Sequence, residues 1–537
     1  MTGNRSSSPK DLGTQARAWL ARLQHIRPLG AVPDAPALSL RDPWPGDPTR
    51  GARLVRSELE YGGAALPITH DIFATTSGCS PLLRAYLHGF TWLRDLRALG
   101  TDTARTRART LVLDFIDTNR PDPLSYEPHI VGARLAAWLG HYDFFAASAD
   151  DDFRQALMVQ LTQDARALSA MLPASFQDQR ALTALKGLTA AAIALPDHAQ
   201  YLPRVMKFLV PELARQFYAD GCHVERSPAA HLMALQDLTE IRALLQAGGK
   251  MPPTELVTII EHAASALRAL RHADGGVTLF NGSKEELASL IDLVLAQAGR
   301  ARGTLAHLKA CGLFRIAAGK SLLFMDAAPP AGPGLDRFAH AGTLGFEFSH
   351  GKDRLIVNCG GAPVLGGDWA NALRNSAAHS TLVIADTSSS EVRDTGLGRR
   401  PLSVNAMRQD AANTAWIEAN HDGWGQVFGA IHHRRLGLSD TGDVLQGEDA
   451  IEAQTPQPFH IRFHLHPHVT ANLAQDGASV LLRTASGQGF VFRAEELEPR
   501  LEDSVYFGQS VPRRSEQIVL TGYADGPQHV RWTVSKV

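Results

Sequence analysis

Two histidine-bearing segments in the second half of the chain carry groups that can exchange protons. One segment is Arg337–Thr343, which contains His340, and the other is Arg374–Thr381, which contains His379. An imidazole changes charge near neutral pH, so it can act as a general acid or base or as a metal ligand. Arg374 adds a positive charge that suits a carboxylate. These residue types favour proton transfer beside an anionic group.

A polar loop in the first half, residues 218–228, offers further groups of this kind. His223 and Tyr218 can move protons, and Glu225 and Arg226 carry charge. The loop contains an Asp-Gly turn and a Ser-Pro helix start, which indicates a connection between two helices. The alternative to a functional loop is therefore an ordinary inter-helix connection with a capping serine.

A third candidate lies near the C-terminus, where polar residues alternate along a predicted strand. His460, Arg462, His464 and His466 share one strand face because successive side chains of a strand point to opposite sides. Such a basic face could meet an anionic sugar, bind a metal or be solvated. Upstream, Trp424 follows a His-Asp-Gly triplet and has a ring that can stack on a sugar.

The elements that must position these residues change type near residue 312. From about residue 80 to 299, apolar residues recur at helical spacing in runs separated by short breaks, for example 104–118, 152–172, 180–195 and 229–247. After residue 312, short alternating segments with frequent turn signals predict antiparallel strands, for example 314–326, 355–358, 432–439 and 460–465. Helices followed by strands predict an α+β chain of two main domains.

The bulk composition excludes several classes of protein. With 537 residues, 44% hydrophobic and 20% charged, the chain is globular and long enough for more than one core. A net charge of −2 gives no basic field for nucleic acid, and no apolar run is long enough to span a membrane. The four cysteines form no paired motif, and the N-terminus lacks a signal-peptide pattern, so a cytoplasmic location is expected.

The histidine segments and the layout together resemble the heparinase II/III-like polysaccharide lyases. The matching features are Phe338-Ala339-His340 before Gly345-Phe346-Glu347, the Ala378-His379-Ser380-Thr381 run and the polar loop at 218–231. The resemblance implies an N-terminal (α/α) toroid followed by a C-terminal antiparallel β-sandwich. The expected domains are an extension over residues 1–80, a toroid over 81–305 and a sandwich over 306–537.

The resemblance also implies a site for an acidic polysaccharide or oligosaccharide, which would be cleaved by β-elimination. The implied catalytic residues are His223, His379, Arg226 and Tyr218. The implied substrate-binding residues are Arg180, Lys186, Glu225, Arg374, Trp424 and His464. The implied metal ligands are His340, Asn358 and His379, with zinc as the candidate metal and a metal-free hydrogen-bonded group as the alternative.

The sequence departs from the family pattern at several of these positions. Phe338 stands in place of a histidine that is a catalytic candidate in the family, and Gly342 in place of an aspartate. Ala229 and Ala230 stand where a tyrosine often acts as acid or base, and Trp424 replaces a tyrosine. Two alternatives to a lyase therefore stay open: a glycoside hydrolase-like enzyme and a non-catalytic glycan-binding or assembly protein.

The hydrolase alternative requires a pair of carboxyl groups at a defined separation. The acids that lie in motifs are Glu225, Glu347 and Asp422.

Overall fold

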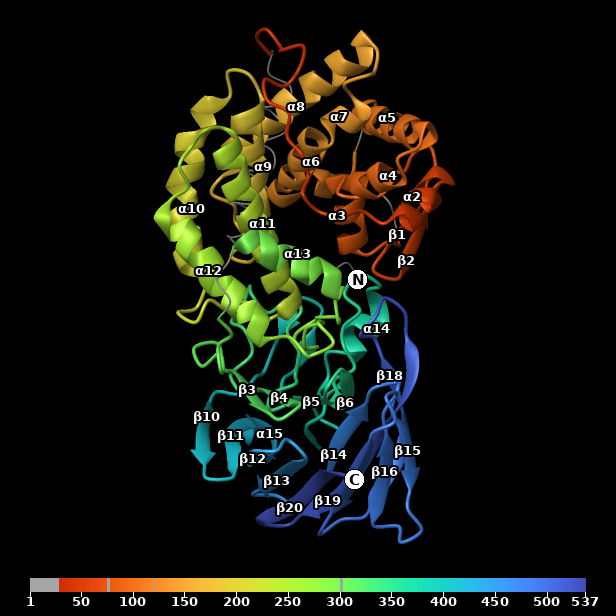
Figure 1. Ribbon diagram of the computed structural model, residues 1–537, viewed down its shortest axis with the longest axis vertical. Helices are drawn as coiled ribbons and strands as arrows, with labels where there is room; N and C mark the ends of the chain where they lie inside the picture. The colour runs from red at the N-terminus through yellow and green to blue at the C-terminus, as the bar shows by residue number, and fades with distance from the viewer. Residues whose placement is uncertain (1–28, 75–77, 120, 300–302) are drawn as a thin grey trace, which may run out of the picture. The chain divides into compact units, whose positions relative to one another are not determined.

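The computed structural model describes residues 29–74, 78–119, 121–299 and 303–537 (Figure 1). The helix expected over residues 14–24 lies outside the described residues. Internal contacts divide the chain into two compact units. Unit 1 comprises the described residues up to Gln216 together with Ala234–Ile260, and unit 2 comprises Phe217–Met233 together with Glu261–Val537. Helices α11 (Pro228–Ala247) and α12 (Thr254–Ala269) contribute residues to both units.

Unit 1 is built from helices that start and stop where the local sequence directs. The bounds are α2 (Pro48–Val55), α3 (Pro81–Gly89), α4 (Leu93–Leu99), α5 (Asp102–Ile116), α6 (Pro128–Gly140), α7 (Tyr142–Phe145), α8 (Asp151–Met171), α9 (Arg180–Ala194) and α10 (Leu202–Gln216). A short hairpin of β1 (Glu58–Tyr61) and β2 (Ala64–Pro67) follows α2. Caps set several starts: the side chains of Ser80, Thr101 and Asp150 accept the backbone N–H groups of Leu83, Ala104 and Phe153.

The helices of unit 1 pack side by side around α6 and α9 (Figure 1). Helix α6 contacts α3, α8 and α9, α9 also contacts α8 and α10, and α5 packs on α4 and α8. Two glycines allow the close approach of α6 and α9, because a Cβ atom added to Gly187 would lie 2.2 Å from the backbone of Gly132. Helices packed on one another in this way are compatible with a toroid, and closure into a ring stays a prediction.

Unit 2 contains two eight-stranded antiparallel sheets. One sheet has the order β10-β11-β12-β13-β20-β17-β16-β15, and the other has the order β18-β19-β14-β6-β5-β4-β3 with β7 also paired to β14. The first sheet comprises β10 (Val404–Ala411), β11 (Thr414–Trp424), β12 (Ala430–Ser439), β13 (Val444–Glu452), β15 (Thr470–Leu473), β16 (Ser479–Arg483), β17 (Gly489–Ala494) and β20 (Gln528–Lys536). The second comprises β3 (Leu313–Ala318), β4 (Ser321–Asp326), β5 (Phe346–His350), β6 (Asp353–Val357), β7 (Leu382–Ile384), β14 (Gln457–Leu465), β18 (Pro499–Tyr506) and β19 (Arg513–Ala524).

The two sheets face each other across an apolar core and so form a sandwich. Phe346 and Phe463 of one sheet pack on Trp532 of the other, with ring centroids 5.5 and 4.8 Å apart. These rings belong to a continuous cluster of buried residues from both sheets. The predicted fold class, a helical N-terminal part followed by an antiparallel β-sandwich, is confirmed. Helix α13 (Ala288–Ala298) and two short elements, α14 (Gly367–Ala372) and α15 (Gly425–Phe428), lie outside the sheets.

A buried polar group crosses this core. Asp449 accepts hydrogen bonds from His432 Nε2 at 2.7 Å, Arg434 Nε at 2.7 Å and Trp532 Nε1 at 2.9 Å. Burial alone would raise the pKa of Asp449, but Arg434 and His432 hold it well below its usual range. Arg434 also donates to the carbonyls of Leu344 and Ser380. This group therefore fixes the segment that carries His379 against the sheet.

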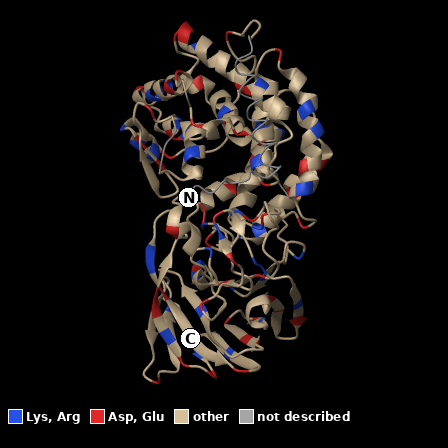
Figure 2. Cartoon of the chain, turned by 180° about the vertical axis from the view of Figure 1, so that it is seen from behind, with Lys and Arg blue, Asp and Glu red and all other residues tan. Residues whose placement is uncertain are grey.

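Charged residues of both signs are interspersed along the elements of both units (Figure 2). Among the described residues, no helix is both long enough and apolar enough to cross a membrane.

We predict that Asp449→Ala destabilises unit 2 strongly, by about 3–5 kcal/mol, because it leaves the buried Arg434 without a counter-charge. Asp503→Ala is the matched control, since the Asp503–Arg514 pair is 76% and 83% exposed and its loss should leave the urea midpoint almost unchanged. Urea denaturation of both variants tests this. Equal stability of the two variants would contradict the role given to Asp449.

Candidate functional site

The structure brings the two predicted histidine segments together. The rings of His340 and His379 lie side by side, with centroids 4.7 Å apart. Both residues are buried, at 4% and 2% exposure. The backbone N–H of Ala341 donates to the carbonyl of Arg374, and this bond ties the first segment to the second. The spatial pairing expected from the sequence is therefore present, but it is enclosed within unit 2.

His340 is held as a neutral hydrogen-bond acceptor. Its Nε2 atom accepts the backbone N–H of Gly282 at 2.8 Å, and its own backbone N–H donates to Asn281 Oδ1 at 3.0 Å. Because Nε2 accepts, the ring proton belongs on Nδ1, which has no partner among the described residues. Burial, His379 and Arg374 together lower the pKa of His340 well below its ordinary value.

His379 is packed against a position that has lost its side chain. A Cβ atom added to Gly342 would lie 3.0 Å from Cγ of His379, so the imidazole covers the place of the family aspartate. Burial lowers the pKa of His379 to about 4, and Glu347 and the carbonyl of Leu373 oppose this shift only in part. At neutral pH the ring is therefore uncharged and closed to solvent.

The anion that acts on His379 is Glu347, a fully buried residue of β5. Its carboxylate accepts from His272 Nε2 at 2.9 Å, the backbone N–H of Leu279 at 2.9 Å and Asn358 Nδ2 at 3.0 Å. Burial would raise the pKa of Glu347, but the bond from His272 and the nearby Arg354 hold it below its ordinary value. Glu347 is thus a satisfied structural carboxylate and not a general acid.

The residues implied as metal ligands do not fit a zinc ion. Asn358 uses its Nδ2 atom on Glu347 and accepts the backbone N–H of Ser380 on Oδ1 at 3.0 Å, so its amide joins two parts of the fold. Zinc favours imidazole, thiolate and carboxylate ligands. Among the described residues, no group of three or more His, Cys, Asp or Glu side chains could hold a metal ion.

The loop at 218–228 is folded back on unit 2. His223 is fully buried between Phe217 and the following turn, and its Nδ1 atom accepts the backbone N–H of Glu225 at 3.4 Å. Its backbone N–H donates to Nδ1 of His231, whose Nε2 in turn bonds the carbonyl of Ala263. Tyr218 is half-buried, and burial raises the pKa of its phenol. The loop thus encloses His223 within the fold, whereas the phenol of Tyr218 stays partly exposed.

Arg226 links this loop to the start of the sandwich through an ion pair and hydrogen bonds. It has a left-handed φ of +55° and is 2% exposed. Its guanidinium ion-pairs with Asp326 and donates to the carbonyls of Cys311 at 2.7 Å and Pro329 at 2.7 Å. The charge expected to bind a substrate is used to join segments of the chain.

Three of the implied substrate-binding residues of the β half are also internal. Arg374 donates to the carbonyls of Ala339, Arg393 and Gly396 at 2.7–3.0 Å and is 6% exposed. Trp424 is fully buried, and its Nε1 atom donates to the carbonyl of Thr387 at 2.8 Å. His464 is 3% exposed and bonds Ser504 Oγ and the carbonyl of Ala377, and burial lowers its pKa to about 3. No sugar can stack on Trp424 in this position.

The two basic candidates in unit 1 are paired with acids. Arg180 forms a two-point ion pair with Asp178 and lies 4.2 Å from the ring centre of Phe176. Lys186 is buried, with its Nζ atom 2.7 Å from Asp237 and 3.3 Å from Glu240. Burial would lower the pKa of Lys186, but the two acids raise it above the ordinary value. Arg180 remains partly exposed, whereas Lys186 belongs to a buried group of ion pairs with Asp237 and Glu240.

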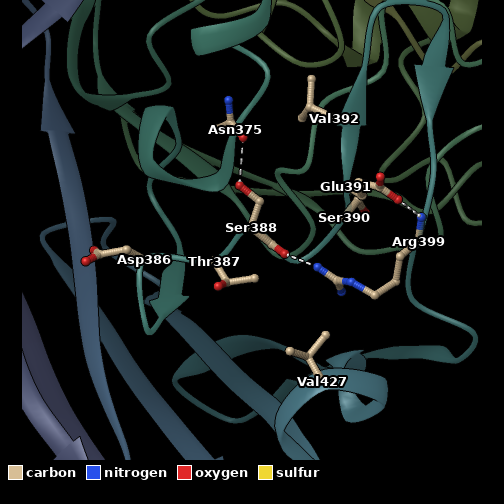
Figure 3. Close-up of a pocket in the computed structure, with 9 residues that line it drawn as sticks. All are labelled: Asn375, Asp386, Thr387, Ser388, Ser390, Glu391, Val392, Arg399 and Val427. Carbon is tan, nitrogen blue, oxygen red and sulfur yellow. Dashed lines mark hydrogen bonds between the residues drawn. The ribbon is translucent and has the colours of Figure 1, made fainter.

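A surface pocket of about 370 Å³ was missed by sequence reasoning (Figure 3). It follows the histidine segment in the chain and is lined by Ser388, Ser390, Glu391 and Arg399, among others. These residues belong to no recognised motif. The run of three serines before Glu391 was the available signal, because closely spaced hydroxyls can form a polar binding surface.

The comparisons with known proteins agree with this fold. The chain matches the family models "Heparinase II/III N-terminus" over residues 115–299 and "Heparinase II/III-like, C-terminal" over residues 300–533. FtsZ-localized protein C of Caulobacter vibrioides is 31% identical, and the alignment covers 98% of this chain and 94% of that protein.

Two solved structures resemble this chain in fold. The crystal structure of heparinase III has a TM-score of 0.75 at 14% identity and covers 97% of this chain and 89% of its own. Heparan sulfate lyase HepC of Pedobacter heparinus has a TM-score of 0.60 at 14% identity, with 98% and 88% covered. At such identities these likenesses show the fold alone.

We predict that acid weakens the folded state through buried histidines such as His379. Its pKa is about 4 in the folded protein and about 6.5 in an unfolded chain, so the unfolded state binds more protons between these values. As the pH falls from 6.5 to 4, each such histidine removes up to ~1.4 kcal/mol of stability per pH unit. His379→Gln should therefore flatten the pH dependence of the urea midpoint between pH 4.5 and 6.5.

The matched substitution His70→Gln should keep the wild-type slope, because the His70 side chain is 98% exposed. If His379→Gln also kept that slope, the imidazole would be open to protons in the folded protein.

Proposed function

Because this chain belongs to the heparinase II/III-like family, we propose that it uses the family fold as a non-catalytic glycan-binding protein in which the lyase site is degenerate. The main support for the proposal is the burial of the two histidine segments. His340 and His379 are buried, uncharged at neutral pH and held within unit 2, and the anion beside them, Glu347, is fully hydrogen-bonded. These groups stabilise the fold and are not open to a substrate.

A β-elimination needs a base for the C5 proton, an acid for the leaving oxygen and positive charge on the uronate carboxylate. At the positions of the family's proton-transferring residues this chain has Phe338, Ala229 and Ala230, which cannot transfer protons. Trp424 replaces a tyrosine and is buried. The acid and base functions are therefore missing at the positions where the resemblance expects them.

The arginines that could supply the positive charge needed by the reaction are already bound to other groups of the protein. Arg226 and Arg374 donate to backbone carbonyls, and Arg226 additionally pairs with Asp326. A guanidinium that satisfies buried carbonyls cannot leave them without exposing unpaired acceptors, which costs about 1–3 kcal/mol for each group. These arginines are thus poor candidates for holding a uronate.

The second candidate is the lyase itself, acting on an acidic glycan. It is favoured by the family models, which together cover residues 115–533. In this case His379 is the residue most expected to take part, because it lies in the best-matching motif. The glycoside hydrolase-like alternative has less support, since Glu347 is fully bonded and Asp422 caps the backbone N–H groups of Leu402 and Ser403.

We further infer that the protein acts together with FtsZ. The support is the relative named for its localisation with FtsZ, because the alignment with it covers 98% of this chain and is not confined to one unit. A binding protein without catalysis also suits a role in assembly.

We predict that the purified protein forms no unsaturated product from a panel of uronate-containing oligosaccharides. The measurement is absorbance near 230 nm, where the product of β-elimination absorbs. Growth of this absorbance in the wild type, and its loss in His379→Ala with the fold retained, would establish the lyase and overturn the non-catalytic proposal.

We also predict that the protein sediments with polymers of FtsZ. With GTP present, FtsZ polymerises and should carry the protein into the pellet, whereas with GDP both should stay in the supernatant. Protein that remains in the supernatant in both cases would contradict an FtsZ-linked role and leave the glycan-binding proposal standing.

A further inference from the structure

The pocket next to the histidine segment has the features of a built binding site. Its volume of about 370 Å³ lies within the range of small-ligand pockets. The labelled side chains in Figure 3 come from Asn375 in the histidine segment, from residues 386–392 after β7, from Arg399 and from Val427 of α15. All of them belong to unit 2. The pocket is separate from the buried His340–His379 pair.

The frame of the pocket is held rigid by hydrogen bonds. Arg399 donates to the carbonyls of Ser388 at 2.6 Å and Ser389 at 3.1 Å and also to that of Gly423. The hydroxyl of Ser388 donates to Asn375 Oδ1 at 3.0 Å (Figure 3). A preformed frame reduces the entropy lost when a ligand binds.

The rim of the pocket carries backbone strain. Ala385 and Asp386 have φ values of +46° and +51°, a region that residues with a side chain rarely adopt. They form a tight turn in which the N–H of Thr387 donates to the carbonyl of Ile384 at 2.9 Å. Strain of this kind tends to occur at functional positions. Here it places Asp386 at the pocket.

One wall of the pocket contains an unsatisfied hydroxyl. Ser390 is fully buried, and its Oγ atom has no hydrogen-bond partner among the described residues. Buried polar groups are nearly always paired, and exceptions need an explanation. Because Ser390 lines the pocket, a ligand hydroxyl or amide that reaches this buried side chain would supply the missing partner.

The charges of the pocket favour an uncharged ligand. Asp386 and Glu391 line it together with one cation, Arg399, whose two terminal nitrogens already donate to backbone carbonyls. Glu391 is paired with Arg393 at 2.8 Å, so the charges of this pair offset each other. The lining therefore offers a uronate carboxylate no cation that is not already engaged. The remaining hydroxyls and carboxylates suit sugar hydroxyl groups, and Val392 and Val427 offer apolar contact for a methyl group.

We propose that this pocket binds an uncharged, acetamido-bearing sugar unit of a glycan, and not a uronate. The inference rests on the proposed glycan-binding function and assigns to it a site and a ligand class. The sugar hydroxyls would bond Ser390, Asp386 and Glu391, and the acetamido methyl would contact the valines.

Isothermal titration of the full chain with two probes tests this proposal. The first probe is tri-N-acetylchitotriose, which is neutral, and the second is a heparosan tetrasaccharide, which carries acetamido groups together with carboxylates. The wild type should bind the neutral probe at least tenfold more tightly than the acidic one.

Three variants test whether the ligand binds in this pocket. Val427→Trp should fill the pocket and weaken binding of the neutral probe more than tenfold, whereas Val511→Trp, at a similarly exposed valine outside the pocket, should leave binding unchanged. Ser390→Ala should weaken binding severalfold without lowering the melting temperature, because the hydroxyl that it removes has no partner in the fold.

The outcomes separate the two proposals. Binding that Val427→Trp leaves intact would overturn the pocket and leave the glycan-binding function standing. Tighter binding of the acidic probe would overturn the ligand class alone. Binding of neither probe by the wild type would overturn the glycan-binding function as well.

Discussion

The buried carboxylate of Glu347 is the constraint on which the centre of unit 2 depends. A charge taken out of water must be compensated by several donors, and here His272, the backbone of Leu279 and Asn358 supply them. Asn358 in turn accepts the backbone N–H of Ser380, the residue after His379, and so holds this segment in place. A single anion thus fixes the loop after α12, two strands of the sandwich and the second histidine segment.

This constraint also accounts for the closed packing around the histidine pair. Once Glu347, His272 and Asn358 satisfy one another, the neighbouring imidazoles of His340 and His379 need neither a metal nor a substrate to be stable in the core. The loss of a side chain at Gly342 lets the ring of His379 pack over the backbone. The same residue types that would serve proton transfer in an open site here serve packing and hydrogen bonding.

The fold was largely predictable, because the spacing of apolar residues along the sequence indicates which face of a helix or strand is buried. The helical runs 180–195 and 229–247 correspond to α9 and α11, and the segments 432–439 and 460–465 correspond to β12 and β14. In strand β13, Gly447 weakens the alternating pattern by which a strand is predicted. The glycine is needed there because the Trp532 ring lies within 2.1 Å of where a Cβ atom would be.

The site was less predictable, because a sequence shows which groups are present and not what they contact. The pairing of His340 with His379 followed from the motif. The partners of Arg374 and Trp424 did not, since a backbone carbonyl can be supplied by any residue. The pocket beside Ser390 likewise depends on segments that only the fold brings together.

The central claim is that the imidazole of His379 is a neutral, closed part of the core and not an exposed base. The most direct test is an NMR titration of protein labelled with ¹³C at histidine Cε1, with the signal of His379 assigned by its loss in His379→Gln. We expect this signal to stay at its neutral position on acidification to pH 5. A signal that titrates with a midpoint near pH 6.5 would contradict it.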